Sequence, residues 1–392
     1  MTKSWPIVGA GALSSVGDTA DEMFESLCAG RSGRAPLRGF TAEWYTAGHL
    51  FERDDREQGA DRPLRATEFL VEAIAQALRD AGLPEDLRDV PVLVGTGLRE
   101  LRSVELWHRD QAPLTAGDLH FGTALRERFG ATDTHTVANA CSASLYALSM
   151  ATDLLAAGAA DTVVVAGTDS ITESMFGIAD RVQSVPPDTI RPFDAERAGS
   201  ILGEGAAAVV LRREPAPDDR VLGWVRGVGI NCDAGHPTAP SLERISDAMN
   251  EAHRRAGTEP DDMDLVMLHG TGTHANDLTE AQAMRAVFGP AVKVPLMTGL
   301  KSLTGHTSGT SGLHSLIVAL RSMATSQVVP IATLRNPIDE VGEFRMVRGE
   351  APVSEPVALA QINAFGFGGV NAVAVVESPA TNAERRERAL RA

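Results

Sequence analysis

The stretch ANACSASLYALSMATDLLAAG, residues 138–158, is small or apolar on nearly every face when it is drawn as a helix. A helix of this composition belongs in the core of a protein rather than on its surface. Cys141 stands where the helix would begin, and the free N–H groups and positive dipole end of a helix N-terminus stabilise a thiolate. The stretch therefore predicts a buried central helix with a candidate nucleophile in its first turn. A small cysteine packed in the core is the alternative interpretation.

Short apolar runs on both sides of this stretch predict strands that alternate with helices. The runs are rich in Val and bounded by Gly or Pro, as in buried strands, and they span residues 6–8, 90–94, 162–166, 206–211, 222–225, 264–268, 294–297, 357–362 and 372–376. Helical apolar spacing is found at residues 18–27, 64–81, 241–256, 276–288 and 312–325. This alternation predicts an α/β fold in which helices cover the sheet faces.

A weak internal repeat divides the chain. GEGAAAVVL at 203–211 resembles GGVNAVAVV at 368–376, and PIVGAG at 6–11 resembles WVRGVG at 224–229. The turn-like APDD at 216–219 separates them, which predicts an N-terminal half at 1–217 and a C-terminal half at 218–378. Chance similarity between Gly- and Val-rich strands would explain this internal repeat equally well. The polar tail at 379–392 is expected to be disordered.

The amino-acid composition argues against some classes of function. The 392 residues include 36 Lys and Arg against 52 Asp and Glu, a net charge of −16. Such an acidic chain is a poor partner for nucleic acid, which needs clustered basic residues. Three widely spaced cysteines form no disulfide framework, so a cytoplasmic location is expected. Because no apolar run approaches the roughly 18 residues of a membrane span, no membrane insertion is expected.

Three further motifs carry candidate reactive side chains. LHGTGTHAND at 268–277 places His269 directly after a predicted strand, and GLKSLTGHTSGTSG at 299–312 contains Lys301 and His306. NAFGFGGVNA at 363–372 is a glycine-rich turn with two phenylalanines. Each motif alone is weak evidence. Cys141, His269 and His306 include no closely spaced ligand pair, so no metal site is expected.

Taken together and in this order, the four motifs resemble the elongating β-ketoacyl synthases of the thiolase superfamily. Residues 6–33 and 190–211 also look like segments of that family, so the resemblance covers nearly the whole chain. It implies a thiolase-like fold with two pseudo-symmetric halves in a layered α-β-α-β-α architecture. Two active-site histidines are typical of the elongating type, whereas chain-starting relatives have Asn in place of the second.

The resemblance also implies a decarboxylative Claisen condensation. Cys141 would hold an acyl group as a thioester, with an oxyanion hole formed by the backbone N–H groups of Cys141 and Phe367. His269 and His306 would face a malonyl thioester on a carrier protein and stabilise the enolate left by loss of CO₂. Lys301 would orient His306. Acidic support for Lys301 is assigned to Glu280 with Asp277, and a simple charge pair at a helix start is the alternative for Asp277.

Substrate and partner contacts follow from the same resemblance. Thr271 and Thr273 would hydrogen-bond a phosphopantetheine arm, and Phe367 would act as a gate with Phe365 beside it. Phe176 and Ser200 would line the acyl pocket, with ordinary core packing as the alternative for Phe176. No bound metal or redox cofactor is required. The expected partners are an acyl carrier protein and a second chain, in a homodimer or in a heterodimer with a related ketosynthase-like chain. Arg62 and Arg65 align with basic residues at the family's carrier entrance, and Arg53 and Arg56 would extend them.

Some residues depart from the family pattern. The stretch 99–136, which builds dimer contacts and lines the acyl pocket in the family, is short and polar here. Ser200 stands where the family often has Phe, and Thr310 and Ser311 replace alanines. These departures favour a specialised fatty-acid or polyketide-type pathway. They leave open an acyltransferase or cyclase that uses acyl-Cys141 without decarboxylation, and a non-catalytic partner subunit, against which the retained Cys141 argues.

Overall fold

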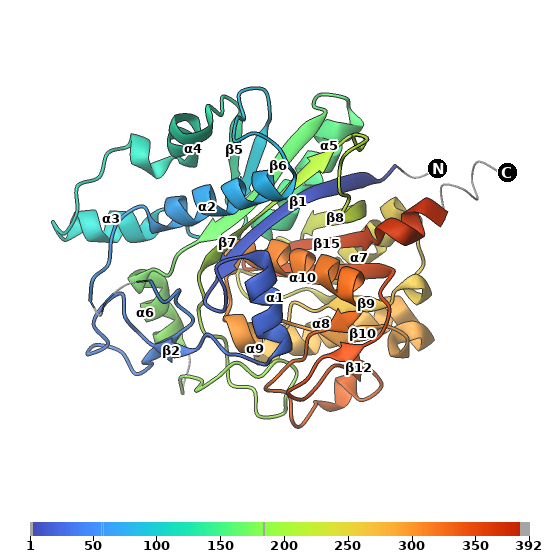
Figure 1. The fold of residues 1–392 in the computed structure, drawn as a ribbon. Helices are drawn as coiled ribbons and strands as arrows, with labels where there is room; N and C mark the ends of the chain where they lie inside the picture. The colour runs from blue at the N-terminus through green and yellow to red at the C-terminus, as the bar shows by residue number, and fades with distance from the viewer. Residues whose placement is uncertain (1–2, 56, 58, 183–184, 385–392) are drawn as a thin grey trace.

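A single mixed sheet forms the centre of the molecule (Figure 1). The computed structural model describes residues 3–55, 57, 59–182 and 185–384. The 11 strands of this sheet lie in the order β12-β10-β9-β14-β15-β8-β1-β7-β6-β4-β5. Their bounds are β1 Trp5–Ser14, β4 Val92–Gly95, β5 Thr134–Val137, β6 Thr162–Asp169, β7 Gly205–Arg212, β8 Gly223–Cys232, β9 Leu265–Met267, β10 Leu296–Thr298, β12 Arg345–Met346, β14 Leu359–Gly366 and β15 Val370–Glu377.

The strand order repeats itself about the centre of the sheet. β1 and β8 pair antiparallel at the middle, and β7 and β15 pair antiparallel with them on either side. β6 and β14 follow antiparallel, then β4 and β9 parallel, then β5 and β10 parallel. The strands that carry the repeated sequences therefore occupy equivalent places, which confirms two pseudo-symmetric halves. The boundary between residues 217 and 218 stays a prediction.

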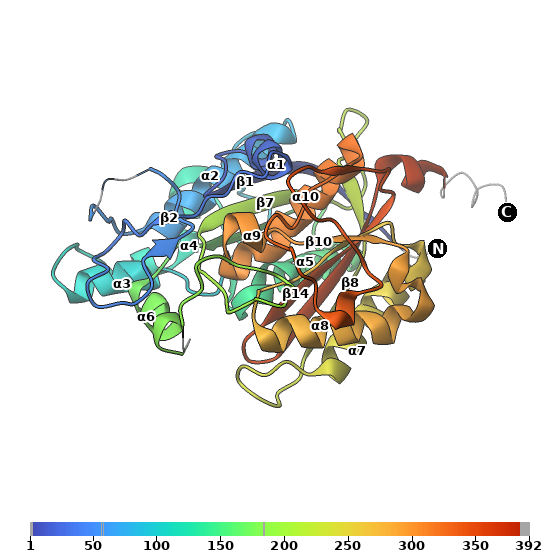
Figure 2. The same cartoon turned by 90° about the horizontal axis from the view of Figure 1, so that it is seen from below.

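Helices cover both halves of the sheet and fill the space between them. Their bounds are α1 Ala20–Cys28, α2 Arg65–Asp80, α3 Leu101–His108, α4 Phe121–Phe129, α5 Ala143–Ala156, α6 Glu173–Val182, α7 Leu242–Ala256, α8 His274–Phe288, α9 Lys301–Thr304 and α10 Ser311–Thr325. α5 and α10 contact strands of both halves, whereas α2 packs on β1, β7 and β6, and α7 packs on β8 and β15 beside α8. Figures 1 and 2 show α2 and α10 on opposite sides of β1 and β7. The order of layers is therefore α2, the first half of the sheet, α5 with α10, the second half of the sheet, and α7 with α8. This is the expected α-β-α-β-α layering.

The central helix α5 is buried because glycines let its neighbours approach closely. A Cβ at Gly95 of β4 would lie 2.4 Å from the backbone N of Ser144. One at Gly312 of α10 would lie 2.6 Å from Cγ of Leu145. Leu145 and Leu148 are fully buried in the largest hydrophobic cluster. The small and apolar composition of residues 138–158 thus reflects contacts on every side of the helix.

Several elements were not predicted from the sequence. α3, α4 and the edge strand β5 lie in the polar stretch 99–136, and α6 follows β6. Together with α3, α6 forms one end of the molecule in both views (Figures 1 and 2). α3 buries polar side chains such as Arg102 and Ser103, so apolar periodicity does not reveal it. α4 buries apolar residues at helical spacing, at positions 121, 125 and 129, and that signal was missed. β5 pairs only with β4, and its side chains are partly exposed.

The expected disorder after residue 378 is wrong for the part that the structure describes. Residues 379–384 are helical. Asn382 is only 1% exposed, and its Nδ2 donates to Glu377 Oε2 at 2.8 Å and to Ser4 Oγ at 3.3 Å. The segment is therefore fixed to the start of β1, although it is polar. Residues 385–392 lie outside the described residues.

Two short two-stranded antiparallel sheets lie apart from the main sheet. β2 Ala35–Pro36 pairs with β3 His49–Leu50, and β11 Gln327–Val328 pairs with β13 Val353–Ser354. No helix in the described ranges is both long and apolar enough to cross a membrane.

Candidate active site

Cys141 lies in the single 3₁₀ turn Ala140–Ser142 that precedes α5. Ala140 has a φ of 46°, a conformation that a non-glycine residue adopts only when its surroundings hold it there. The end of β14 supplies that support, because a Cβ at Gly366 would lie 3.1 Å from Cys141 N and 3.3 Å from Ala140 Cβ. Ser311 Oγ of α10 also donates to the Cys141 carbonyl at 3.3 Å. The turn is thus held between the two halves of the molecule.

Two backbone N–H groups point at the Cys141 sulfur. They belong to Phe367 and to Cys141 itself, and both lower the pKa of the thiol. Burial nevertheless raises that pKa to about 11, against the opposing positive charge of Lys301 and with a further increase from Asp169. The two N–H groups thus favour the thiolate, as expected, but they do not outweigh burial. The thiol is protonated at neutral pH because its desolvation outweighs the N–H groups.

His269 follows β9 in a loop that Glu280 of α8 holds in place. The Glu280 carboxylate accepts from His269 N at 2.7 Å and from Gly270 N at 2.8 Å. It also accepts from the Asn276 and Asn363 side-chain amides at 3.3 and 3.0 Å. Asn363 opens the glycine-rich motif on β14, so Glu280 connects two of the sequence motifs. All four of these bonds go to the loop and its neighbours. The negative charge of Glu280 also raises the pKa of Lys301 through space, so acidic support of that lysine stays a prediction.

Lys301 contacts His269 rather than His306. Its Nζ lies 3.3 Å from His269 Nδ1 and also donates to the His269 carbonyl oxygen. The expected orientation of His306 by Lys301 is therefore corrected. Burial lowers the pKa of Lys301 to about 8, and the negative charge of Glu280 opposes that shift through space. Below pH 8 the ammonium donates to Nδ1, which leaves the proton of the neutral His269 ring on Nε2.

His306 stands edge-on to His269. The two ring centroids are 5.4 Å apart with an interplanar angle of 80°. Burial lowers the pKa of both rings well below the usual value, and the positive charge of Lys301 lowers them further. Both imidazoles are therefore neutral at physiological pH. The backbone of His306 pairs with the segment before β7, donating to Ile201 O at 2.9 Å and accepting from Gly203 N at 3.0 Å.

Asp277 and Asp169 are buried carboxylates close to this pair. Asp277 accepts from Phe193 N and Gly272 N, and burial raises its pKa to about 7. It thus anchors the loop, and its charge also raises the pKa of Lys301 through space. Asp169 was not predicted. It accepts from Thr96 Oγ1 and from the N–H groups of residues 97, 98 and 309, and burial raises its pKa to about 6. An acidic residue directly after an apolar strand run was the available signal.

The residues expected to bind substrate do not lie together in one pocket. Phe176 and Ser200 line one small cavity of ≈ 30 Å³, about the share of one water molecule. Phe176 also packs edge-on against Phe40 and Tyr45, with centroid distances of 5.4 and 4.9 Å. Phe365 and Phe367 differ in exposure. The first is buried 5.7 Å from the His269 ring, whereas the second is 63% exposed.

Thr271 and Thr273 lie beside His269, and their hydroxyl groups hydrogen-bond each other at 2.8 Å. Thr273 also caps α8 by accepting from Asn276 N at 3.3 Å. Contact with a phosphopantetheine arm stays a prediction for both residues.

Family models match both halves of the chain. The model described as beta-ketoacyl synthase, N-terminal domain, matches residues 6–216, and that of the C-terminal domain matches residues 222–335. The chain belongs to the β-ketoacyl synthase family. It is an acyl-transferring enzyme of the ketosynthase type with a thiolase-like fold.

Curated relatives and solved structures agree with this family. The chain is 29% identical to 3-oxoacyl-[acyl-carrier-protein] synthase 2 of Vibrio cholerae, covering 93% of this chain and 96% of that protein. It is 34% identical to nodulation protein E of Rhizobium meliloti, over 60% of each chain. The solved ishigamide ketosynthase/chain length factor has a TM-score of 0.87 at 29% identity, covering 96% of this chain and 100% of that one.

Arg65 of this ketosynthase cannot present its charge to a carrier protein, so that expectation is wrong. Its side chain is 1% exposed, and its guanidinium pairs with Glu204 at 2.6 Å and with Asp55 at 2.7 Å. Arg62 is 40% exposed and pairs with Glu68 at 2.8 Å and with Asp55 at 3.4 Å. Arg62 therefore stays a candidate for docking. Arg53 pairs with Asp18, and Arg56 lies outside the described residues.

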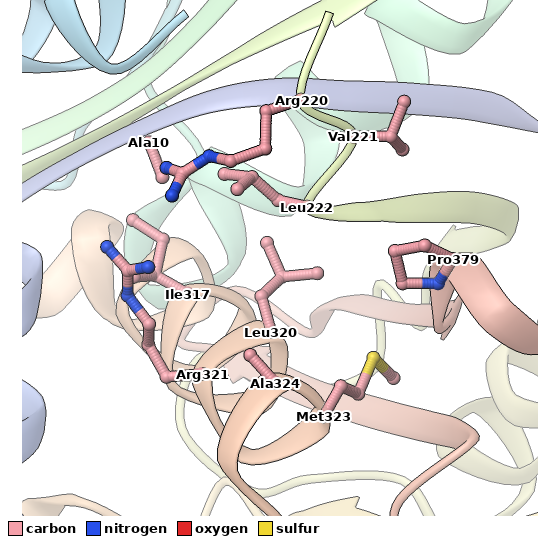
Figure 3. A pocket seen from close by; sticks show the side chains of 10 residues that line it. All are labelled: Ala10, Arg220, Val221, Leu222, Ile317, Leu320, Arg321, Met323, Ala324 and Pro379. Atoms are coloured by element: carbon pink, nitrogen blue, oxygen red, sulfur yellow. The ribbon is translucent and has the colours of Figure 1, made fainter.

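A groove of ≈ 200 Å³ lies away from this site, between α10 and the segment before β8 (Figure 3). Arg220 and Arg321 lie at one side of it, with Leu222 and Leu320 at its centre. Arg220 is paired with Asp80, and Arg321 with Asp21. None of the ketosynthase motifs lines this groove. Within the described part of the chain, no group of three or more His, Cys, Asp or Glu side chains is arranged to hold a metal ion.

Proposed function

We propose that this ketosynthase performs a decarboxylative Claisen condensation with Cys141 as the acyl carrier. The observation that supports it is a thiol faced by two backbone N–H groups, with two neutral imidazoles beside a buried lysine whose charge lowers the pKa of that thiol. Each component has a use in this chemistry. N–H pairs stabilise oxyanions, and neutral imidazoles donate to an enolate oxygen without transferring a full charge.

In the first half-reaction, the Cys141 sulfur attacks the carbonyl carbon of an acyl thioester. A new C–S bond forms, and the bond to the donor thiol breaks. The Cys141 proton leaves with the departing thiol, so no other reactant is needed. The N–H groups of Cys141 and Phe367 receive the developing oxyanion. Since the pKa of the thiol is about 11, removal of its proton contributes to the barrier of this step.

In the second half-reaction, a malonyl thioester binds next to His269 and His306. Its terminal C–C bond breaks, CO₂ leaves, and the electron pair becomes an enolate whose oxygen accepts from the two imidazoles. The enolate carbon attacks the acyl carbon, the C–S bond to Cys141 breaks, and one proton from solvent restores the thiol. The product is a β-ketoacyl thioester. Lys301 supports this step by fixing the proton of His269 on Nε2.

An acyl carrier protein is the proposed donor of both thioesters, held through phosphopantetheine. Relatives named 3-oxoacyl-[acyl-carrier-protein] synthase 2 support this, at 29% and 30% identity. Thr271 and Thr273 are proposed contacts for the arm, and Arg62 for the carrier. A homodimer, or a heterodimer with a related chain, is the proposed assembly, the latter supported by the likeness to the solved ishigamide ketosynthase/chain length factor. The sparse cysteines support a cytoplasmic location.

The test is intact-mass spectrometry of the protein after incubation with an acyl-carrier thioester. The acyl mass should appear on the wild type and be absent from the Cys141→Ala variant. Cys28→Ala and Cys232→Ala are matched controls and should keep the adduct. Addition of malonyl-carrier should then release CO₂ and form a β-ketoacyl product.

Two outcomes would replace the proposal. An adduct on Cys141 that passes to an amine, alcohol or internal carbon without CO₂ release would indicate an acyltransferase or cyclase. No adduct at all would indicate a non-catalytic partner subunit.

A further inference from the structure

Another buried histidine, His314, lies in the first turn of α10 and belongs to none of the four sequence motifs. It is 2% exposed. Its Nε2 lies 3.2 Å from the Leu13 carbonyl oxygen and 3.1 Å from the Ala206 carbonyl oxygen. These residues face each other where β1 pairs with β7, at the centre of the sheet. Carbonyl oxygens only accept, so Nε2 must carry the proton.

This arrangement determines what the other ring nitrogen does. Burial lowers the pKa of His314 to about 4, so the ring is neutral at physiological pH and its Nδ1 can only accept. The Thr307 hydroxyl lies 3.1 Å from Nδ1 and must therefore be the donor. Thr307 is 2% exposed and directly follows His306. A continuous set of hydrogen bonds thus joins the sheet centre to the neighbour of an active-site imidazole.

The His306 ring needs such external support. Its Nδ1 is buried without a hydrogen-bond partner among the described residues, so no side-chain bond to that nitrogen fixes the ring. Before it in the chain, Gly305 has a φ of 70°, and after it Ser308 has a φ of 48°. The His306 backbone is held by its bonds to Ile201 and Gly203, and further bonds hold the backbone that follows it. Thr307 supplies one of them.

We propose that His314 is a positioning residue that holds His306 through Thr307. The inference rests on the proposed function, in which His306 acts on the malonyl thioester and Cys141 acts first and separately. Loss of the His314–Thr307 bond should therefore slow decarboxylation and spare the acylation of Cys141. A displacement of about 1 Å in a reacting group can reduce a rate by up to about 100-fold.

The test uses variants of the full chain that cut the bond from each side. His314→Gln keeps an amide donor for the two carbonyls but lacks the Nδ1 acceptor. Thr307→Val removes the donor, and Thr307→Ser is the matched control that keeps it. With malonyl and hexanoyl thioesters of pantetheine, we expect CO₂ release to fall roughly tenfold in the first two variants and in their double variant alike. Acylation of Cys141 should stay within about twofold, and Thr307→Ser should resemble the wild type.

Three results would overturn the proposal while the wild type still condenses. They are an unchanged CO₂ release in Thr307→Val, a parallel fall of acylation and CO₂ release, and multiplied losses in the double variant. A wild type that acylates Cys141 and releases no CO₂ would instead sink the proposed function. In that case crystal structures of the two Thr307 variants test the positioning role by itself. A turn at residues 307–310 that moves in Thr307→Val and not in Thr307→Ser supports that role. A turn that stays in place in both variants refutes it.

Discussion

At the scale of single residues, the reactivity of Cys141 depends on a balance between burial and one positive charge. Burial raises its pKa to about 11, and Lys301 is the largest opposing influence. Replacing Lys301 by Met should therefore raise the pKa further and slow alkylation of Cys141 by iodoacetamide. An opposite charge at close range shifts a pKa by about one to three units, so the rate should fall about tenfold or more. Mass spectrometry of the modified cysteine measures that rate.

The pH dependence of this effect has a definite direction. Lys301 itself has a pKa of about 8, so its charge is present below pH 8 and is lost above it. The difference between wild type and Lys301→Met should be largest near pH 7 and should shrink above pH 8. Lys293→Met, which changes an exposed lysine, is the control. Equal alkylation rates for all three proteins at pH 7 would refute the assigned role of Lys301.

Asp169 makes folding stability depend on pH. Burial raises its pKa from 3.8 to about 6, so its stabilising contribution is complete below 3.8 and is lost as the pH rises through about 6. Asp169→Asn carries no charge at any pH and serves as a reference, because all other groups titrate alike in both proteins. The stability of the wild type relative to the variant should fall by about 1 to 2 kcal/mol between pH 5 and pH 8. Urea unfolding at both pH values measures it, and a constant or growing difference would contradict the assignment.

The sequence singled out the candidate residues of the site but not their contacts. Cys141, His269, Lys301 and His306 each stand in a short motif of small residues, which local sequence reveals. Their partners come from distant parts of the chain. Asp169 binds Gly309 N across 140 positions, and Arg65 binds Glu204 across 139. No local pattern shows that Arg65 is buried, so an exposed docking role was assigned to it.

At the scale of elements, the end of β14 determines where Cys141 sits. A Cβ at Gly366 would lie 2.8 Å from Val370 Cγ2 and 3.1 Å from Cys141 N, both closer than normal contact. Gly366→Ala should therefore displace the two N–H groups that face the sulfur. Loss of one such donor lowers kcat by about 10² to 10³, so we expect Cys141 acylation to slow by about 100-fold. Intact-mass time courses measure it.

The matched control for this substitution is Gly117→Ala, where the nearest atom to a new Cβ would be 3.6 Å away. It should acylate at the wild-type rate. Thermal unfolding of both variants separates a local displacement from general loss of the fold, since overpacking costs about 1 to 3 kcal/mol. Acylation of Gly366→Ala at the wild-type rate would show that β14 does not position the turn.

Strands and helices were predictable where packing is apolar and not where it is polar. β6 and β7 are buried along nearly their whole length and stood out as Val- and Ala-rich runs. α3 buries Arg102, which pairs with Asp61 at 2.6 Å and Glu173 at 3.2 Å. An ion-paired arginine in the core has the same sequence signature as a solvated one. The part of the chain that forms α3 therefore looked like a polar segment without regular structure. The apolar spacing of α4, with Phe121, Leu125 and Phe129, was available and was missed.

At the scale of the whole molecule, each half contributes a helix that packs against strands of the other half. α5 of the first half contacts β8 and β15 of the second, and α10 of the second contacts β1, β6 and β7 of the first. The two helices share one hydrophobic cluster, in which the fully buried residues include Leu145, Leu148, Leu313, Leu316 and Ile317. At about 2 kcal/mol for each such side chain when fully exposed, separation of the halves would cost at most about 10 kcal/mol. That equals the whole net stability of a typical domain.

Separate expression of residues 1–217 and 218–392 should therefore yield two chains that do not fold alone. Each would lack a cooperative thermal transition by circular dichroism, because its helix would expose the shared cluster to water. Co-expression should restore a complex that acylates Cys141 and releases CO₂, since Cys141 lies in one half and both His269 and His306 lie in the other. A cooperative transition in either fragment alone would mean that the predicted halves are independent domains, and that the seam between β1 and β8 contributes little to folding.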